Sequence, residues 1–231
     1  MLQNYQAHLI TKEQLNQTVY RFEFGLDEPK IIDFLAGQYL LLDIKQGYRQ
    51  YSISSSSNQH HSVETIVDTL PMGIGSQYLL NLAVGQPISF RAPMGLFTLK
   101  SNSNPKVFLA TGAGISQIKS MLFNLSESDF SAPFFLLWGL KKQSALYLQD
   151  CWQKLAQSKP NFSYHYCLSQ ENFGQAPFFA GHIQEKLNSM PLPTTSEFYL
   201  CGRQPTVEAL QGYLQTTLSV PIENIFHENF T

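Results

Sequence analysis

The sequence predicts two domains, a small antiparallel β-barrel followed by a doubly wound parallel α/β domain. In the first hundred residues, short runs rich in β-branched and aromatic residues are separated by turn residues, and one helical stretch interrupts them. After a polar, turn-prone segment at residues 100–105 (KSNSNP), wholly apolar runs alternate with helical runs. Such strands are typical of a parallel sheet covered on both faces. We therefore expect domains at residues 1–99 and 104–231.

The length of 231 residues suits two domains of this size. For the first domain we expect a helix just after residues 73–76, marked by Leu79, Leu82 and Ala83, and strands at 18–24, 38–44, 50–54, 63–69 and 87–91. For the second we expect strands at 107–110, 134–138, 162–168 and 197–201. Its first expected helix carries an apolar stripe of Ile115, Ile118, Leu122 and Leu125. Three more helices are expected at residues 148–156, 181–187 and 205–215.

Composition argues against several classes of protein. The formal net charge is −2 and no block of Lys or Arg occurs, so a nucleic-acid-binding face is not expected. No run approaches the roughly 18 apolar residues of a membrane helix, and the first residues, MLQNYQAHLITKEQ, lack a signal-peptide pattern. The widely spaced Cys151, Cys167 and Cys201 predict neither a disulfide framework nor an iron–sulfur cluster. This cysteine usage fits a reducing cytoplasm.

The first candidate binding segment is Arg49-Gln50-Tyr51-Ser52. In a strand, Arg49 and Tyr51 share one face and Ser52 lies at the adjacent edge. A guanidinium suits phosphate, a tyrosine ring can stack on another flat ring, and a hydroxyl can bond a ring nitrogen. These are the three needs of a flavin nucleotide. Taken alone, an exposed Arg beside a core Tyr is the simpler interpretation.

Two glycine-containing turns stand before helices. At residues 73–76 (GIGS) we expect Ser76 to be the N-cap of a helix whose N-terminus attracts phosphate. The segment 110–117 (ATGAGISQ) follows a buried strand and opens a helix, as a pyrophosphate-binding turn does. The full G-x-G-x-x-G pattern is not met, because Gln117 occupies the third glycine position, and the strand ending at Gly139 lacks a terminal acid. Turns that serve only packing remain the alternative.

Three further segments are weak signals when taken singly. They are PMGLF at residues 93–97, Cys201-Gly202 at the end of a buried strand, and ENF at 228–230. Their simplest interpretations are a turn followed by a core Phe, a buried structural cysteine, and a frayed chain end.

In this fixed order, the segments resemble the motifs of the ferredoxin–NADP reductase-like family over essentially the whole chain. Residues 37–39 (GQY) look like its G-Q-Y/F strand start. Residues 49–52 match its R-x-Y-S/T motif, residues 73–76 its G-x-x-S motif and residues 93–97 its P-x-G-x-F motif. Residues 110–121 resemble its nicotinamide-nucleotide loop, and residues 138–141 resemble its W-G-x-R motif. Its C-G and E-x-F motifs match residues 201–202 and 228–230. The departures are Thr111 for Gly, Gln117 for Pro and Lys141 for Arg.

This resemblance implies a six-stranded barrel that binds FAD and an α/β domain that binds NAD(P)H, with the nicotinamide approaching the flavin. The implied catalytic residues are Ser52, Cys201 and Glu228. The implied cofactor-binding residues are Arg49, Gln50, Tyr51, Ser52, Ile53, Gly73, Ile74, Gly75, Ser76, Thr111, Gly112, Ala113, Gly114, Lys141, Cys201, Gly202 and Phe230.

The resemblance also implies the reaction: a hydride passes from NAD(P)H to FAD, and electrons pass on to a separate acceptor. The acceptor would be a ferredoxin, an iron–sulfur or oxygenase component, or free flavin. Two alternatives stay open, a flavin reductase that uses free flavin as substrate and a non-catalytic flavin-binding electron-transfer or regulatory subunit. Gln170 follows Ser169 where NADP-selective relatives tend to carry Ser-Arg, which favours NADH.

Overall fold

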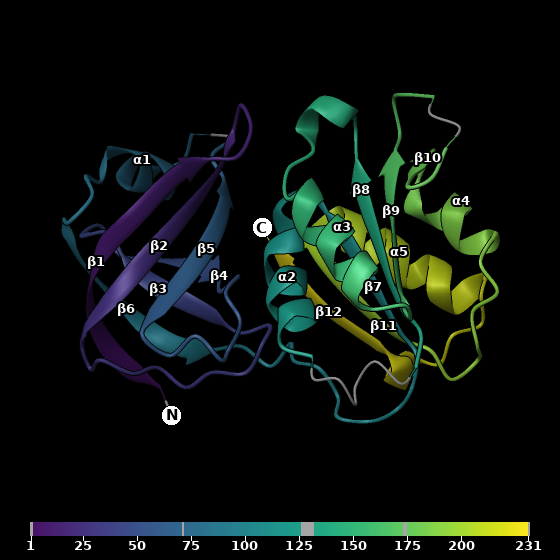
Figure 1. The fold of residues 1–231 in the computed structure, drawn as a ribbon, viewed down its shortest axis with the longest axis horizontal. Helices are drawn as coiled ribbons and strands as arrows, with labels where there is room; N and C mark the ends of the chain where they lie inside the picture. Colours follow the sequence, from purple (N-terminus) through teal and green to yellow (C-terminus); the bar gives the residue numbers. More distant parts are fainter. Residues whose placement is uncertain (1, 71, 126–131, 173–174, 231) are drawn as a thin grey trace. The chain divides into compact units, whose positions relative to one another are not determined.

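The computed structural model describes residues 2–70, 72–125, 132–172 and 175–230. Its contacts divide the chain into two compact units (Figure 1). Unit 1 holds Met1–Leu99 and Ser116–Asn124, and unit 2 holds Lys100–Ile115 and Leu125–Thr231. The short stretch Ser116–Asn124 therefore groups with the first unit, although it lies inside the range expected for the second domain.

Unit 1 is built on a six-stranded sheet in which all neighbouring strands are antiparallel. The strand order is β4-β3-β6-β1-β2-β5, which confirms the predicted fold class of this half. The strands are β1 (Gln3–Gln14), β2 (Val19–Glu28), β3 (Tyr39–Asp43), β4 (Tyr48–Ser52), β5 (Ser62–Asp68) and β6 (Pro87–Met94). A backbone hydrogen bond of 2.7 Å from the Ser54 N–H to the Glu64 carbonyl joins the chain after β4 to β5, at the two ends of that order.

Strand β1 was not among the strands expected from the sequence, although it lies in the middle of the sheet. It pairs with β2 on one side and β6 on the other. Its core-facing residues are Tyr5, Ala7 and Leu9, all buried, and most of the residues between them are polar. The two-residue alternation is a genuine strand signal, but the excess of polar residues keeps the segment from standing out as hydrophobic.

Helix α1 (Ile74–Asn81) begins one turn earlier than predicted. Its N-cap is Gly73, whose extended backbone has φ −72° and ψ 166°, so the expectation of Ser76 as N-cap is wrong. The Gly73 carbonyl accepts the first helical hydrogen bond, from the Gln77 N–H at 2.9 Å, which places Ser76 inside the first turn. As a glycine, this N-cap has no side chain that could cap the helix start. Its backbone N–H groups are therefore left for other acceptors.

Helix α2 (Ile115–Phe123) groups with unit 1 because its polar side chains are bonded there. The Lys119 ammonium lies 2.7 Å from the Glu64 carboxylate and donates to the Ser54 carbonyl at 3.1 Å. The Gln117 side-chain amide donates to the Gly37 carbonyl at 2.9 Å. The ion pair is partly buried and the other two contacts are buried, so together they fix the helix on unit 1. The helix ends at Phe123, and Leu125, expected on its apolar stripe, lies beyond that end.

Unit 2 is built on a six-stranded sheet in which every pair is parallel, as predicted. The strand order is β10-β9-β8-β7-β11-β12. The strands are β7 (Lys106–Thr111), β8 (Phe134–Leu140), β9 (Phe162–Leu168), β10 (Phe178–Ala180), β11 (Glu197–Arg203) and β12 (Ile225–Phe230). The chain runs from β7 outward to β10 and then returns to β11 on the other side of β7. The topological switch point therefore lies between β7 and β11, where ligands of such sheets bind at the carboxyl ends.

Helices cover both faces of this sheet. Helices α4 (Ile183–Asn188) and α5 (Gln204–Thr216) share a core with alternate strand residues such as Leu109 of β7. Helix α3 (Gln149–Ser158) contacts β9 and buries Trp152, and it lies on the side of the sheet opposite α5 (Figure 1). Two strands, β10 and β12, were not predicted, and the segment 228–230 is part of β12, not a frayed end.

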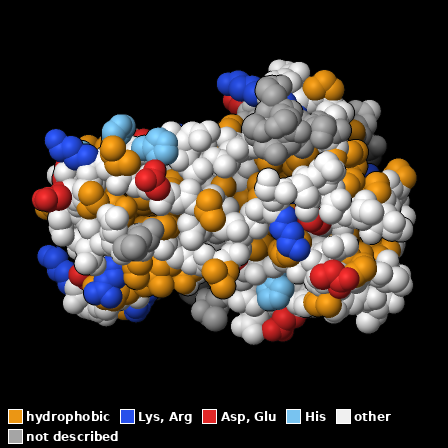
Figure 2. Space-filling view, turned by 90° about the horizontal axis from the view of Figure 1, so that it is seen from below, with side chains coloured by type: hydrophobic (Ala, Val, Ile, Leu, Met, Phe, Trp, Pro, Cys, Tyr) orange, Lys and Arg blue, Asp and Glu red, His pale blue; other side chains and the backbone are white. Residues whose placement is uncertain are grey.

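The surface is mostly uncharged. Figure 2 shows Lys, Arg, Asp and Glu side chains as small scattered groups on the face that it displays, in keeping with a formal net charge of −2. Within the described ranges, none of the helices combines the length and hydropathy that crossing a membrane would need. The three cysteines are all free thiols.

Candidate cofactor sites

The candidate site in unit 1 forms where β4 meets the start of α1. A Cβ atom added at Gly75 would lie 2.4 Å from the Tyr51 hydroxyl and 3.0 Å from Cγ of Arg49. Real Cβ atoms essentially never come closer than 3.0 Å to another heavy atom. The missing side chain at Gly75 is thus what lets the helix start approach the β4 side chains. The structure brings together two segments that the sequence could only place one after the other.

Burial sets the properties of the β4 side chains. Tyr51 packs against the barrel core and is partly exposed. Its partial burial raises the pKa of its hydroxyl to about 12, although the positive charge of Arg49 acts to lower this pKa. The phenol is therefore neutral at physiological pH and can donate a hydrogen bond. Ser52 is buried at the end of the strand, opposite Tyr39 in the register. Ile53 is fully buried and its N–H bonds the Gln38 carbonyl, so its side chain serves the core.

The same region presents groups that suit an anion. One guanidinium nitrogen of Arg49 donates to the Tyr48 carbonyl at 2.8 Å, which orients the side chain and leaves further N–H donors. The first turn of α1, from Ile74 to Ser76, carries no side-chain cap. An uncapped helix start with a neighbouring guanidinium attracts phosphate.

The candidate site in unit 2 lies at the switch point, in the loop after β7. A short 3₁₀ turn, Gly112–Gly114, follows Thr111. A Cβ at Gly114 would lie 2.1 Å from the Cys201 carbonyl oxygen, and one at Gly202 would lie 2.0 Å from the Thr111 hydroxyl oxygen. Both glycines are therefore required for the loop to sit directly against the carboxyl end of β11.

Two aromatic residues hold this loop from the other side. The Trp138 indole N–H donates to the Gly112 carbonyl at 3.0 Å, and the Tyr147 hydroxyl reaches the same oxygen at 3.4 Å. The two rings meet edge to face with centroids 4.8 Å apart. Gly112 itself has φ +52° and open space where a Cβ would be, so its outer side is accessible. The sequence singled out Trp138 only by its motif and gave no indication of Tyr147, which lies 35 positions from Gly112.

The remaining predicted residues lie along β11, β12 and the end of β8. Cys201 pairs in register with Glu228, and Arg203 pairs with Phe230. Cys201 is fully buried, and burial raises its thiol pKa well above the ordinary value, with the Glu228 carboxylate adding to the shift. The thiol is therefore neutral and not a nucleophile. Glu228 and Phe230 are partly exposed, and Lys141 is exposed just beyond β8.

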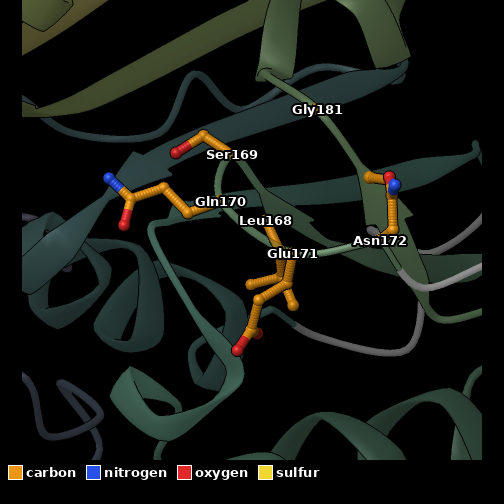
Figure 3. Close-up of a pocket in the computed structure, with 7 residues that line it drawn as sticks. Leu168, Ser169, Gln170, Glu171, Asn172 and Gly181 are labelled. Atoms are coloured by element: carbon orange, nitrogen blue, oxygen red, sulfur yellow. The ribbon is translucent and has the colours of Figure 1, made fainter.

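A cavity of about 330 Å³ lies at the carboxyl end of β9 (Figure 3). It is lined by Leu168, Ser169, Gln170, Glu171, Asn172, Ala180 and Gly181. The Glu171 carboxylate accepts a hydrogen bond from the backbone N–H of Gln143. The sequence drew attention to Ser169 and Gln170, but it did not predict a cavity or a carboxylate in its wall.

The two candidate sites fit two different dinucleotides. Unit 1 offers a guanidinium, a half-buried aromatic ring and an uncapped helix start, close to a hydroxyl at a strand end. Unit 2 offers a glycine turn at the switch point of a parallel sheet. These are the requirements of a flavin dinucleotide and of a nicotinamide dinucleotide respectively. The arrangement defines the class of oxidoreductases with separate FAD-binding and NAD-binding domains.

Comparison with known families agrees with this class. Residues 6–99 match the oxidoreductase FAD-binding domain, and residues 108–212 match the oxidoreductase NAD-binding domain. The chain belongs to the ferredoxin–NADP reductase-like family, and its cofactors are FAD and NAD(P)H.

Two curated relatives are electron transfer components. The chain is 34% identical over 189 residues to the anthranilate 1,2-dioxygenase electron transfer component of Acinetobacter baylyi, covering 80% of this chain and 55% of the relative. It is 30% identical over 232 residues to the toluate 1,2-dioxygenase electron transfer component of Pseudomonas putida, covering 98% and 67%. The chain thus spans little more than half of the first relative.

A solved structure shares the fold. The flavohem-like FAD/NAD-binding domain of nitric oxide dioxygenase from Vibrio cholerae superposes with a TM-score of 0.87 at 21% identity, covering 98% of both chains.

Proposed function

We propose that this chain accepts a hydride from NAD(P)H on bound FAD and delivers electrons to a separate protein acceptor. The observation that supports this most strongly is the convergence of Arg49, Tyr51 and Gly75, because one site then offers anion binding and an aromatic face. Bound FAD would supply the conversion of a two-electron hydride donor into single electrons. The chain's own residues would bind and orient the nucleotides.

In unit 1, we assign the pyrophosphate of FAD to Arg49 and the turn 73–76, which includes Gly73, Ile74, Gly75 and Ser76. Tyr51 would stack on the flavin ring as a neutral phenol. Ser52 would donate a hydrogen bond at the reactive edge of the ring, and Gln50 and Ile53 would contact the flavin through their backbone. The burial of the Ile53 side chain supports this backbone-only role.

In unit 2, we assign the nicotinamide dinucleotide to the loop of Thr111, Gly112, Ala113 and Gly114. The open side of Gly112 supports this role, because backbone can approach a phosphate closely there. Lys141 would contribute a charge at the end of β8.

At the end of β11, Cys201 and Gly202 would border the nicotinamide, with Glu228 and Phe230 beside them on β12. The buried, neutral thiol of Cys201 supports a shape-defining role, not covalent chemistry.

The two relatives named as dioxygenase electron transfer components support an acceptor of that kind, either an oxygenase, its iron–sulfur component or a ferredoxin. A cytoplasmic location is proposed with it, supported by three free thiols in the chain. A flavin reductase that uses free flavin as substrate is the second candidate, and a non-catalytic flavin-binding subunit is the third. The uncapped helix start favours bound FAD, because it has a use chiefly for a dinucleotide.

The visible spectrum separates the three candidates. We expect purified protein to be yellow and to bleach when NADH or NADPH is added without oxygen. Colourless protein that oxidises NADH only with added flavin would point to a flavin reductase. Yellow protein that responds to neither nucleotide would point to a binding subunit, and it would refute the proposed reaction.

Ser52→Ala tests the reactive-edge assignment. We expect the limiting rate of flavin reduction at saturating NADH to fall about tenfold or more, with a smaller effect on NADH binding, because a hydrogen bond to the reacting ring is lost. Stopped-flow absorbance measures both. Ser52→Thr keeps the hydroxyl and is the matched control. An unchanged limiting rate in Ser52→Ala would remove Ser52 from the reaction.

Arg49→Ala tests the anion assignment. We expect the variant to lose most of its FAD on gel filtration, because a guanidinium–phosphate contact is strong and specific. Arg91, which lies over the Tyr48 ring on the same sheet, gives the control Arg91→Ala. Full flavin occupancy in Arg49→Ala would contradict the assignment.

A further inference from the structure

The chain that leaves β4 is fixed by hydrogen bonds of its backbone. Ser52 ends the strand, and the next residue, Ile53, donates its N–H to the Gln38 carbonyl at 3.1 Å. The Ser54 N–H then donates to the Glu64 carbonyl at 2.7 Å. The Ser52 hydroxyl itself has no hydrogen-bond partner among the residues that the structure describes. Its position is therefore set by the backbone alone.

Helix α2 holds the same stretch of chain through two of its side chains. The Lys119 ammonium donates to the Ser54 carbonyl at 3.1 Å, and the Ser120 hydroxyl donates to the Ser55 carbonyl at 2.7 Å. Both of these hydrogen bonds are buried. The helix therefore helps to set the direction in which the chain continues after Ser52.

The Glu64 carboxylate of β5 links the Lys119 ammonium to the same residue a second time. Its Oε1 atom lies 2.7 Å from the ammonium and accepts a hydrogen bond of 2.6 Å from the Ser54 hydroxyl. Arg21 lies 3.7 Å from the other carboxylate oxygen, and its side chain is 33% exposed, against 11% for Lys119. Lys119 is thus the closer and more buried of these two cations, and it contacts both the backbone of Ser54 and, through Glu64, its side chain.

We propose that Lys119 is a positioning residue for hydride transfer, which acts through the Ser54 carbonyl to hold the Ser52 hydroxyl at the reactive edge of the flavin. This inference rests on the proposed function, which assigns that edge to Ser52. Taking an ammonium and a carboxylate out of water is costly, and their attraction roughly offsets that cost. The geometry that the pair fixes therefore explains it better than stability does. A displacement of about 1 Å near reacting groups can slow a reaction about a hundredfold.

Two substitutions at position 119 separate the charge from the length of the side chain. Lys119→Met keeps much of the length but loses the charge and every hydrogen bond of the ammonium. Lys119→Arg is the conservative variant, because a guanidinium can donate to the Ser54 carbonyl and to the Glu64 carboxylate. A third variant, Ser120→Ala, removes a single hydroxyl from the same arrangement and leaves the ion pair intact, so it tests the proposal even if Lys119→Met does not fold.

Leu9→Ala is the matched control for stability. Leu9 is fully buried in the barrel core, so this truncation also destabilises unit 1. Its backbone hydrogen bonds outside the strand pairing are made with Gly85 and Gln86, not with the chain after β4.

The rate test uses the full chain loaded with FAD, at a temperature where every variant is folded. Anaerobic stopped-flow with NADH or NADPH gives the limiting rate of flavin reduction and the dissociation constant of the nucleotide. We expect Lys119→Met to lower the limiting rate about tenfold with little change in the dissociation constant. Lys119→Arg should recover most of the rate, Ser120→Ala should lower it by less than Lys119→Met does, and Leu9→Ala should keep the parental rate.

A double variant tests whether Lys119 acts through Ser52. In a Ser52→Ala background, Lys119→Met should have little further effect on the limiting rate, because the hydroxyl that it positions is already absent. Additive losses in the double variant would show that the two residues act independently.

Amide hydrogen exchange gives a readout that needs neither nucleotide nor turnover. The N–H groups of Ile53 and Ser54 donate to backbone carbonyls, so their exchange rates report on the chain after β4. Mass spectrometry of the peptide that contains them should show exchange about tenfold faster in Lys119→Met than in the parent, and a much smaller change in Leu9→Ala.

Four results would overturn the inference and leave the proposed reaction intact. They are a parental limiting rate in folded Lys119→Met, equal losses of rate in Lys119→Met and Leu9→Ala, additive losses in the double variant, and a parental rate in Ser120→Ala when Lys119→Met does not fold. If neither NADH nor NADPH reduces the flavin of the unmodified chain, the proposed reaction fails, and the visible circular dichroism of bound FAD decides the inference. Lys119→Met and Ser52→Ala should then change that spectrum alike, and a change in only one of the two variants would overturn the inference.

Discussion

Gly114→Ala is a substitution for which the structure predicts a large effect from a single methyl group. The added Cβ would lie 2.1 Å from the Cys201 carbonyl oxygen, 2.4 Å from its carbon and 2.8 Å from the Gly202 nitrogen. All three are backbone atoms of β11, which is paired on both sides. Ordinary contact begins at 3.4 Å, so the loop or the strand must shift by more than an ångström.

Such a shift has a cost in stability and in binding. Overpacking a well-packed region usually costs about 1–3 kcal/mol, and we expect the upper end because backbone cannot turn aside as a side chain can. The shift also moves Gly112 and Ala113 away from their positions against β11. We therefore expect NAD⁺ affinity to fall about tenfold or more, while FAD binding, which we assign to unit 1, stays unchanged.

Urea unfolding and calorimetric titration with NAD⁺ measure the two effects, and the flavin absorbance reports FAD. Gly212→Ala is the matched control, because a Cβ at Gly212 meets nothing within 4 Å and the residue lies inside α5. Alanine in a helix interior is favoured over glycine by roughly 0.5–1 kcal/mol, so this control should be slightly more stable than the parent. A Gly114→Ala variant with parental stability and parental NAD⁺ affinity would refute the idea that this loop must lie against β11.

Two further predictions concern buried groups. Lys119→Met should lower the free energy of unfolding of unit 1 by about 3 kcal/mol in urea denaturation, because it leaves the Glu64 carboxylate without its closest cation. The control Lys154→Met, at an exposed position, should leave the stability unchanged. Similar stabilities for the two variants would contradict this prediction. Iodoacetamide at pH 8 should quickly label one of the three thiols, that of half-buried Cys151, because burial raises the pKa of the Cys167 and Cys201 thiols. Mass spectrometry of the native chain counts the labels. Two or three labels would be evidence against the burial of Cys167 and Cys201.

The sequence predicted elements with a strong apolar or aromatic run and missed three strands that are short or of mixed polarity. Strand β9 was predicted with both ends correct, because Phe162–Leu168 carries a strong aromatic and apolar signal. Strand β1 was missed because most of its residues are polar. Strands β10 and β12 escaped because one has three residues and the other is an edge strand of mixed polarity. Local pattern carries little information about a strand whose stability comes from its partner.

The candidate sites divide in the same way. The segments themselves could be recognised, since their order and residue types are properties of the chain. That these segments lie side by side in the fold could not be predicted, because the approach of Gly75 to Tyr51 depends on how β4 and α1 pack. The shared hydrogen-bond acceptor of Trp138 and Tyr147, the Gly112 carbonyl, likewise joins residues that are distant in the sequence. The Ser76 N-cap was wrong although serine is preferred over glycine at that position, because the helix begins earlier and glycine at position 73 can also serve as N-cap.

The grouping of Ser116–Asn124 with unit 1 has a consequence for dissecting the protein. A fragment that stops at Leu99 would lose the hydrogen bond from Gln117 to the Gly37 carbonyl and the ion pair between Lys119 and Glu64. Such a fragment, although it includes the complete six-stranded sheet, would be an incomplete folding unit. An autonomous version would need the nine-residue helix supplied again, for instance through a circularly permuted gene in which it is fused back to the barrel.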